Sequence, residues 1–173
     1  VRPWRSHQGE FGNMGSGETL EVSPSIKVEI VGGAPMREQE QYLEKLKRMV
    51  EEKNLGEVIQ FTGPVPNTKI VQHLQAADLF VHNCRGGLDK AILEPMAAGL
   101  PVLSCNDSYE HLLDQYQDLL IFRQSDAEEL SRKIQQIMDI KPEEREKIGA
   151  YLQKKVRAEH GLDSLIQKIV SSL

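Results

Sequence analysis

Short β-rich runs alternate with longer helical patterns from Ser25 to Asp139, and this alternation constrains the fold more than any other feature of the sequence. Strands separated by helical segments of about ten or more residues are typical of βαβ units, which build a parallel sheet. Because βαβ crossovers are right-handed, helices should cover both faces of that sheet. The pattern predicts an α/β fold with a Rossmann-like, doubly wound parallel sheet. The predicted strands are 26–31, 58–62, 78–82, 101–105 and 119–122, and the predicted helices are 36–54, 68–77, 89–98, 108–116 and 127–139.

The order of the strands predicts where a ligand would bind. Right-handed crossovers with a switch between the first and third strands give the order 58–62, 26–31, 78–82, 101–105, 119–122. In open α/β sheets, ligands bind at such a switch, beyond the carboxyl ends of the strands. The loops at this switch contain the glycine pairs Gly32-Gly33 and Gly86-Gly87, so the sequence predicts a binding crevice between them.

The two ends of the chain differ from this middle part. Residues 1–24 hold closely spaced glycines among polar residues, with neither a helical nor a strand period, and we predict an irregular segment. The stretch from Pro142 to Leu173 is predicted to be helical, with a break at His160–Gly161 and an amphipathic last helix from Leu162. We expect the apolar face of that last helix to be incompletely covered. One domain is therefore predicted over residues 25–173, and a chain that opens on Val1 is expected to be a fragment.

Composition and charge exclude several classes of protein. The 173 residues are 39% hydrophobic and 27% charged, as expected for one globular domain rather than a disordered chain. The net charge of -5 argues against a nucleic-acid-binding surface. No apolar run approaches the roughly 18 residues that a membrane-spanning helix needs. Two cysteines make no disulfide framework and, without a third ligand, recommend no metal site, so we expect a reduced, cytoplasmic setting.

The segment from Asn83 to Pro101, NCRGGLDKAILEPMAAGLP, is the best candidate for chemistry. Its two glycines allow close approach of the backbone to a ligand, and Asp89 offers an N-cap for the helix that follows. The N–H groups of a helix N-terminus suit a phosphate, and Lys90 adds a full positive charge. Glu94 is one turn further on, at i+4 from Lys90, where its carboxylate could accept hydrogen bonds from the two vicinal hydroxyls of a ribose. A plain strand–turn–helix with a surface Lys–Glu pair explains the same residues.

The run GGLDKAILEPMAAGLPVLS resembles the donor-binding motif of GT-B glycosyltransferases, in particular the retaining enzymes of family 4. That motif holds two glutamates, the second followed by a small-residue helix, Gly, x, Pro and Val. Two further runs, VEIVGGAP and VIQFTGPVPNTKIVQHLQAADLFVHN, are similar to the segments that precede the motif in such enzymes. The resemblance covers residues 26–173 and implies the C-terminal, nucleotide-sugar-binding half of the fold, followed by C-terminal helices.

The resemblance also implies roles for individual residues. Glu94 matches the second glutamate, which holds the ribose hydroxyls. Gly87, Leu88 and Asp89 match positions near the donor sugar, and Lys90 and Ala91 match positions near the diphosphate. The turn Gly63–Val65 matches the segment that contacts the base, with Val65 as a site residue. Gly32 and Gly33 match the glycine loop that lines the crevice. Gly86 stands where the first glutamate would be, which matches a Gly-x-Leu-Asp-Lys variant of the motif. The first strand of the family's domain, with its basic residues, has no counterpart in residues 1–24.

The resemblance implies a glycosyltransferase that moves a sugar from a UDP-, GDP- or ADP-linked donor to an acceptor hydroxyl, with retention, no metal and no cofactor. The acceptor-binding N-terminal domain is missing, so this fragment is expected to be inactive alone. A cytoplasmic location is expected, with peripheral membrane contact through the full-length enzyme as a further implication.

Other functions compete with this interpretation. A non-catalytic nucleotide-binding module is favoured by Gly86 and by the missing basic strand, and a sugar-nucleotide epimerase shares the fold. A receiver domain would need acids where Gly32-Gly33 and His82-Asn83 stand. A dinucleotide oxidoreductase would need GxGxxG and a later acid, which Gly32-Gly33-Ala34-Pro35 does not supply.

Overall fold

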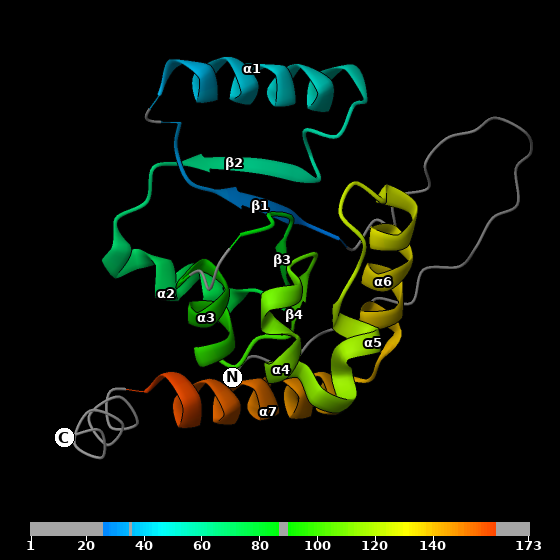
Figure 1. Ribbon diagram of the computed structural model, residues 1–173. Helices are drawn as coiled ribbons and strands as arrows, with labels where there is room; N and C mark the ends of the chain where they lie inside the picture. Colours follow the sequence, from blue (N-terminus) through cyan, green and yellow to red (C-terminus); the bar gives the residue numbers. More distant parts are fainter. Residues whose placement is uncertain (1–25, 35, 87–89, 162–173) are drawn as a thin grey trace, which may run out of the picture. The chain divides into compact units, whose positions relative to one another are not determined.

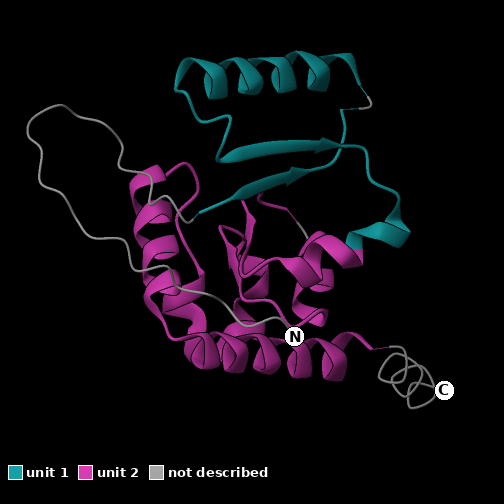
Figure 2. Cartoon of the chain, turned by 180° about the vertical axis from the view of Figure 1, so that it is seen from behind, with its two compact units in different colours: residues 1–70 teal, residues 71–173 magenta. Residues whose placement is uncertain are grey.

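The computed structural model describes residues 26–34, 36–86 and 90–161. The chain divides into two compact units, residues 1–70 and 71–173 (Figure 2). The predicted irregular segment 1–24 and the predicted last helix from Leu162 lie outside the described residues. The single domain predicted over 25–173 remains a prediction.

The first unit contains one βαβ unit and the start of a further helix (Figure 1). Its elements are β1 (Val28–Val31), α1 (Arg37–Glu52), β2 (Ile59–Gly63) and the first residues of α2 (Asn67–Ala76). The two strands are parallel, with Val28 opposite Ile59 and a register shift that sets Val31 opposite Gly63. In α1 the half-buried apolar residues follow a helical period, at Leu43, Leu46 and Val50, so this helix has one apolar stripe. The first predicted crossover is thus confirmed.

The second unit contains a parallel strand pair surrounded by helices. Strands β3 and β4 run parallel, with Phe80 opposite Val102 and His82 opposite Ser104. An isolated parallel bridge joins Ser104 to Ile121 on the other side of β4. The elements are β3 (Phe80–His82), α3 (Lys90–Ala97), β4 (Val102–Ser104), the 3-10 turn η1 (Asp107–Tyr109), α4 (Glu110–Leu113), the 3-10 turn η2 (Asp114–Tyr116), α5 (Gln117–Leu120), α6 (Ala127–Asp139) and α7 (Pro142–His160).

The core of the second unit is mostly aliphatic, as the low aromatic content predicts. Helix α3 contributes Ile92 and Met96, β4 contributes Val102 and Leu103, and α7 contributes Leu152, all of them at most 1% exposed. Side chains of this size each gain on the order of 1.5–3 kcal/mol from full burial. Helices α3 and α7 pack against each other in this core, and that packing fixes the helix that carries Lys90 and Glu94.

Two predictions about the strands need correction. The described strands form two separate two-stranded sheets, one in each unit, and no ladder joins β1 to β3, whereas one five-stranded sheet was predicted. The predicted strand 119–122 is reduced to the bridge at Ile121, because the preceding residues form the helical turn α5. A short apolar run such as LLIF fits either state, and its period cannot decide between them.

The predicted helix 108–116 is divided into η1, α4 and η2. Asp114, with φ at 42° and ψ at -117°, ends α4. The other helices agree with the prediction to within about two residues, and α6 agrees at both ends. The predicted break at His160–Gly161 is the end of α7. Among the described residues, no helix combines the length and apolarity needed to cross a bilayer.

Candidate functional site

In the first unit, a glycine loop after β1 lies against the turn after β2. The Gly32 amide donates to the Gly63 carbonyl at 3.2 Å, and both residues have positive φ, 139° and 71°. A Cβ at Gly33 would stand 2.7 Å from Cγ of Pro64, so this close approach requires glycine. Val65 follows and is half-buried. The predicted crevice residues Gly32 and Gly33 therefore lie against the turn that leads to Val65, the predicted base contact.

In the second unit, the loop after β3 leads to the start of α3. Gly86, Lys90, Ala91 and Glu94 are all exposed, and Lys90 and Glu94 stand one turn apart on the same side of the helix. The N-terminal turn of α3 carries the positive end of the helix dipole. The predicted contacts Gly87, Leu88 and Asp89 lie outside the described residues.

A chain of hydrogen bonds connects this loop to the buried end of β4. Ser104 Oγ lies 3.4 Å from His82 Nδ1 and accepts from the Asn106 amide at 3.0 Å. Asn106 Oδ1 in turn accepts from the Ser108 amide at 3.0 Å, and Ser108 Oγ donates to the Gly86 carbonyl at 3.2 Å. His82 and Asn106 are both buried. These bonds hold the loop at Gly86 in place, and His82 is packed in the interior.

Arg85 faces a carboxylate. Its guanidinium lies 3.7 Å from Asp107 Oδ2, with 60% of the Arg85 side chain exposed. Exposed ion pairs of this kind contribute at most about 1 kcal/mol. Arg85 can therefore leave Asp107 at little cost.

The second unit also contains a small cavity and two cysteines. A cavity of about 120 Å³ opens beside Asn83 and is lined also by Phe122, Ser125, Asp126, Ala127 and Leu130. Ligand pockets usually measure about 300–1,000 Å³, so this one suits water or a small group.

Both cysteines are free, with Cys84 exposed and Cys105 buried. Burial raises the pKa of the Cys105 thiol above its usual value.

The candidate residues thus form two groups, one in each unit, and their union in one donor site remains a prediction. The sequence analysis missed the hydrogen-bond chain through Asn106 and Ser108. Its signal was present, because Asn before Asp-Ser is a common cap for a short helical turn, and the Asn106 side chain caps η1.

This chain is similar to proteins that are named as mannosyltransferases. It is 34% identical over 89 residues to a GDP-mannose-dependent alpha-(1-6)-phosphatidylinositol monomannoside mannosyltransferase of Mycolicibacterium smegmatis, covering 47% of this chain and 22% of that protein. It is 24% identical over 153 residues to the human GDP-Man:Man(3)GlcNAc(2)-PP-Dol alpha-1,2-mannosyltransferase, covering 83% of this chain and 31% of that protein. The chain therefore spans less than a third of the length of these relatives.

Solved structures show the same fold. The crystal structure of Anabaena Alr3699/HepE in complex with UDP and glucose matches with a TM-score of 0.73 at 20% identity, over 87% of this chain and 41% of that one. The α/β fold is thus the Rossmann-like fold of GT-B glycosyltransferases. The model of the family described as glycosyl transferases group 1 matches residues 18–155, so the chain belongs to this family.

Proposed function

We propose that this chain binds the nucleotide diphosphate sugar donor, as the C-terminal half of a GT-B glycosyltransferase that transfers the sugar to an acceptor hydroxyl. One observation carries the proposal. Lys90 and Glu94 are exposed together on the first turns of α3, directly after a glycine loop and within the part of the chain that matches the family.

The chemistry of these groups fits a nucleotide. Glu94 accepts hydrogen bonds from the ribose hydroxyls, and a carboxylate acceptor makes these bonds stronger than neutral ones. The amides at the start of α3 and the Lys90 ammonium neutralise the diphosphate, which is the leaving group of the transfer. With these groups in place, the reaction needs neither a metal ion nor a cofactor. Retention of configuration follows from the resemblance to family 4.

The two mannosyltransferase relatives favour guanine as the base of the donor. Both of their names specify GDP-mannose as the donor. We therefore expect GDP to bind this chain more tightly than UDP or ADP. A thermal-shift panel of the three nucleotides tests this order, and no shift with any of them would refute donor binding by this chain.

Three single variants test the assignment of the site. Glu94→Gln should weaken binding of the best nucleotide by roughly ten- to a hundredfold, since a hydrogen bond to a charged group contributes about 1.5–3 kcal/mol. Lys90→Ala should weaken it less, because backbone amides share the phosphate charge. Arg85→Ala should change it least, because the nearby Asp107 carboxylate offsets the positive charge that Arg85 could offer to a phosphate. Calorimetric titration measures all three, and a Glu94→Gln variant that binds like the parent would contradict the ribose assignment.

A non-catalytic nucleotide-binding module is the second candidate, and Gly86 favours it, because no carboxylate stands where the family has its first glutamate. Release of nucleotide from the preferred donor by the full-length protein distinguishes the two functions. An enzyme releases it faster than its Glu94→Gln variant does. A module shows no release above the uncatalysed rate, although it still binds.

A further inference from the structure

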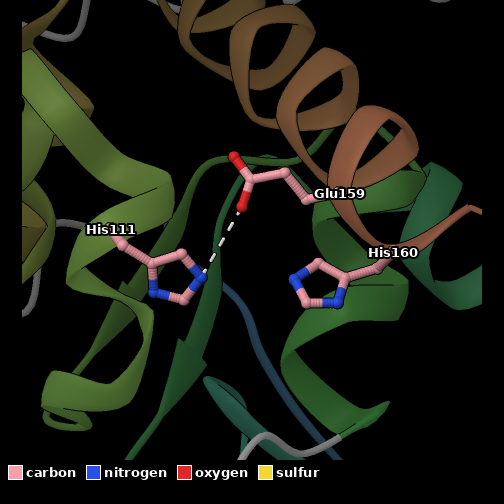
Figure 3. A group of neighbouring side chains, drawn as sticks. All are labelled: His111, Glu159 and His160. Carbon is pink, nitrogen blue, oxygen red and sulfur yellow. Dashed lines mark ion pairs between the residues drawn. The ribbon is translucent and has the colours of Figure 1, made fainter. Parts of the chain in front are cut away.

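Three side chains with metal-binding atoms meet where α4 lies beside the last turn of α7 (Figure 3). His111 comes from α4, and Glu159 and His160 are the last two residues of α7. Their ligand atoms all lie within 4.8 Å of one another. His111 Nε2 is 3.7 Å from Glu159 Oε2, and the two imidazole rings have centroids 6.4 Å apart at an interplanar angle of 60°. None of these residues belongs to the nucleotide-binding groups above.

We propose that His111, Glu159 and His160 bind a divalent transition-metal ion of the zinc type. Two imidazoles and one carboxylate are a common ligand set for Zn²⁺, with water in the fourth position. With Zn–N bonds of about 2.0–2.1 Å, two tetrahedral imidazole ligands place their ring centroids about 5.2 Å apart. The observed 6.4 Å therefore requires each ring to move inward by only about half an ångström or slightly more. Both histidines are exposed, so such movements meet little resistance.

The surroundings of Glu159 prepare its carboxylate for this role. Lys155 Nζ lies 3.7 Å from Glu159 Oε1, the oxygen that does not face His111. Lys155 is itself held by Asp114 Oδ2 at 2.7 Å. This arrangement leaves Oε2 directed toward His111 and orients the ligand, as outer partners do in known metal sites.

The electrostatics of the site also favour a cation. With neutral imidazoles, the charges of Glu159, Asp114 and Lys155 sum to one negative charge. The site lies at the C-terminus of a 19-residue helix, where the dipole adds further negative potential. Hard ions such as Mg²⁺ prefer oxygen ligands, so imidazole ligands select Zn²⁺, Ni²⁺ or Cu²⁺ instead. A bound ion would join α4 to the end of α7 by direct bonds.

Calorimetric titration of the metal-free 173-residue chain with Zn²⁺ tests the proposal. We expect one ion per chain, an increase in the melting temperature, and no comparable response to Mg²⁺. His111→Ala and Glu159→Gln should each weaken Zn²⁺ binding by at least about tenfold, because even outer partners of a metal site contribute 10- to 100-fold.

Two control variants locate the ion. His73→Ala removes a histidine on α2, and Cys84→Ser removes an exposed thiol, and both should leave Zn²⁺ binding unchanged. Circular dichroism of each variant confirms that it is folded. Absence of Zn²⁺ binding, unaltered binding in His111→Ala, or loss of binding in Cys84→Ser would overturn the proposal.

Discussion

The contact between Gly149 in α7 and Gly99 after α3 allows a sharp test of the packing in the second unit. A Cβ at Gly149 would stand 1.8 Å from the Gly99 carbonyl oxygen and 2.7 Å from its carbonyl carbon. Both of these atoms belong to the backbone, so rotation of a side chain cannot relieve the overlap. Gly149→Ala is therefore expected to separate α7 from the turn that ends α3.

Two opposing effects decide the sign of the change in stability. Alanine in place of glycine inside a helix gains about 1 kcal/mol. Overpacking of a close contact costs typically about 1–3 kcal/mol, and an overlap with backbone belongs at the upper end of that range. Real Cβ atoms essentially never lie closer than 3.0 Å to another heavy atom, and the distance from this Cβ to the Gly99 oxygen is far below that limit. We expect Gly149→Ala to lower the free energy of unfolding by about 2 kcal/mol.

Urea unfolding followed by circular dichroism measures this change, and two variants calibrate it. Ala150→Gly, at the exposed neighbouring position of α7, should cost about 1 kcal/mol through helix propensity alone. Gly56→Ala, where a Cβ would meet nothing within 4 Å, should be neutral or stabilise by up to about 1 kcal/mol. A Gly149→Ala variant as stable as the parent, or more stable, would show that the two backbones are not in contact.

Two further predictions concern titration and reactivity. The Lys155 ammonium, and to a smaller extent the Tyr151 hydroxyl, hold the pKa of the Asp114 carboxyl below its usual value. The stability that this carboxylate contributes is therefore present above about pH 4 and is lost as the pH falls through the lowered pKa. Acid unfolding of Asp114→Asn should therefore show a smaller loss of stability below about pH 4 than that of the parent. A thiol reagent should label the exposed Cys84 quickly and the buried Cys105 only when the protein unfolds. Rapid labelling should therefore disappear in the Cys84→Ser variant. If that variant still reacted rapidly with one equivalent of reagent, the burial of Cys105 would be contradicted.

The strands and helices were largely predictable, because their signals are local. The apolar period of α6 and the Pro and acidic residues at the start of α7 define these helices within the sequence itself. The region 107–121 was not predictable in the same way. Its helical turns are divided at Asp114, which has a positive φ and whose carboxylate contacts the Lys155 and Tyr151 side chains of α7. Both partners lie far from residue 114 in the sequence, so a prediction from local sequence does not include them.

The exposure of the candidate residues on α3 was predictable, and the hydrogen bonds that hold the preceding loop were not. The exposure of Lys90 and Glu94 on one side of α3 follows from their spacing. The hydrogen-bond chain from His82 to Gly86 depends on β4 lying parallel to β3, which sets Ser104 opposite His82. A contact between residues 22 positions apart is set by the pairing of strands, and a motif of adjacent residues cannot reveal it.

The glycines show how a structure separates packing from binding where a sequence cannot. Gly33 and Gly149 are required by their neighbours, because a Cβ would overlap Pro64 in one case and the Gly99 backbone in the other. At Gly86, by contrast, a Cβ would meet no described atom within 4 Å, and its φ lies outside the left-handed region. The fold of the described residues therefore does not require glycine at this position. The packing of the described residues thus gives no reason for glycine at this position, and the resemblance to the family motif remains the basis for relating Gly86 to a ligand.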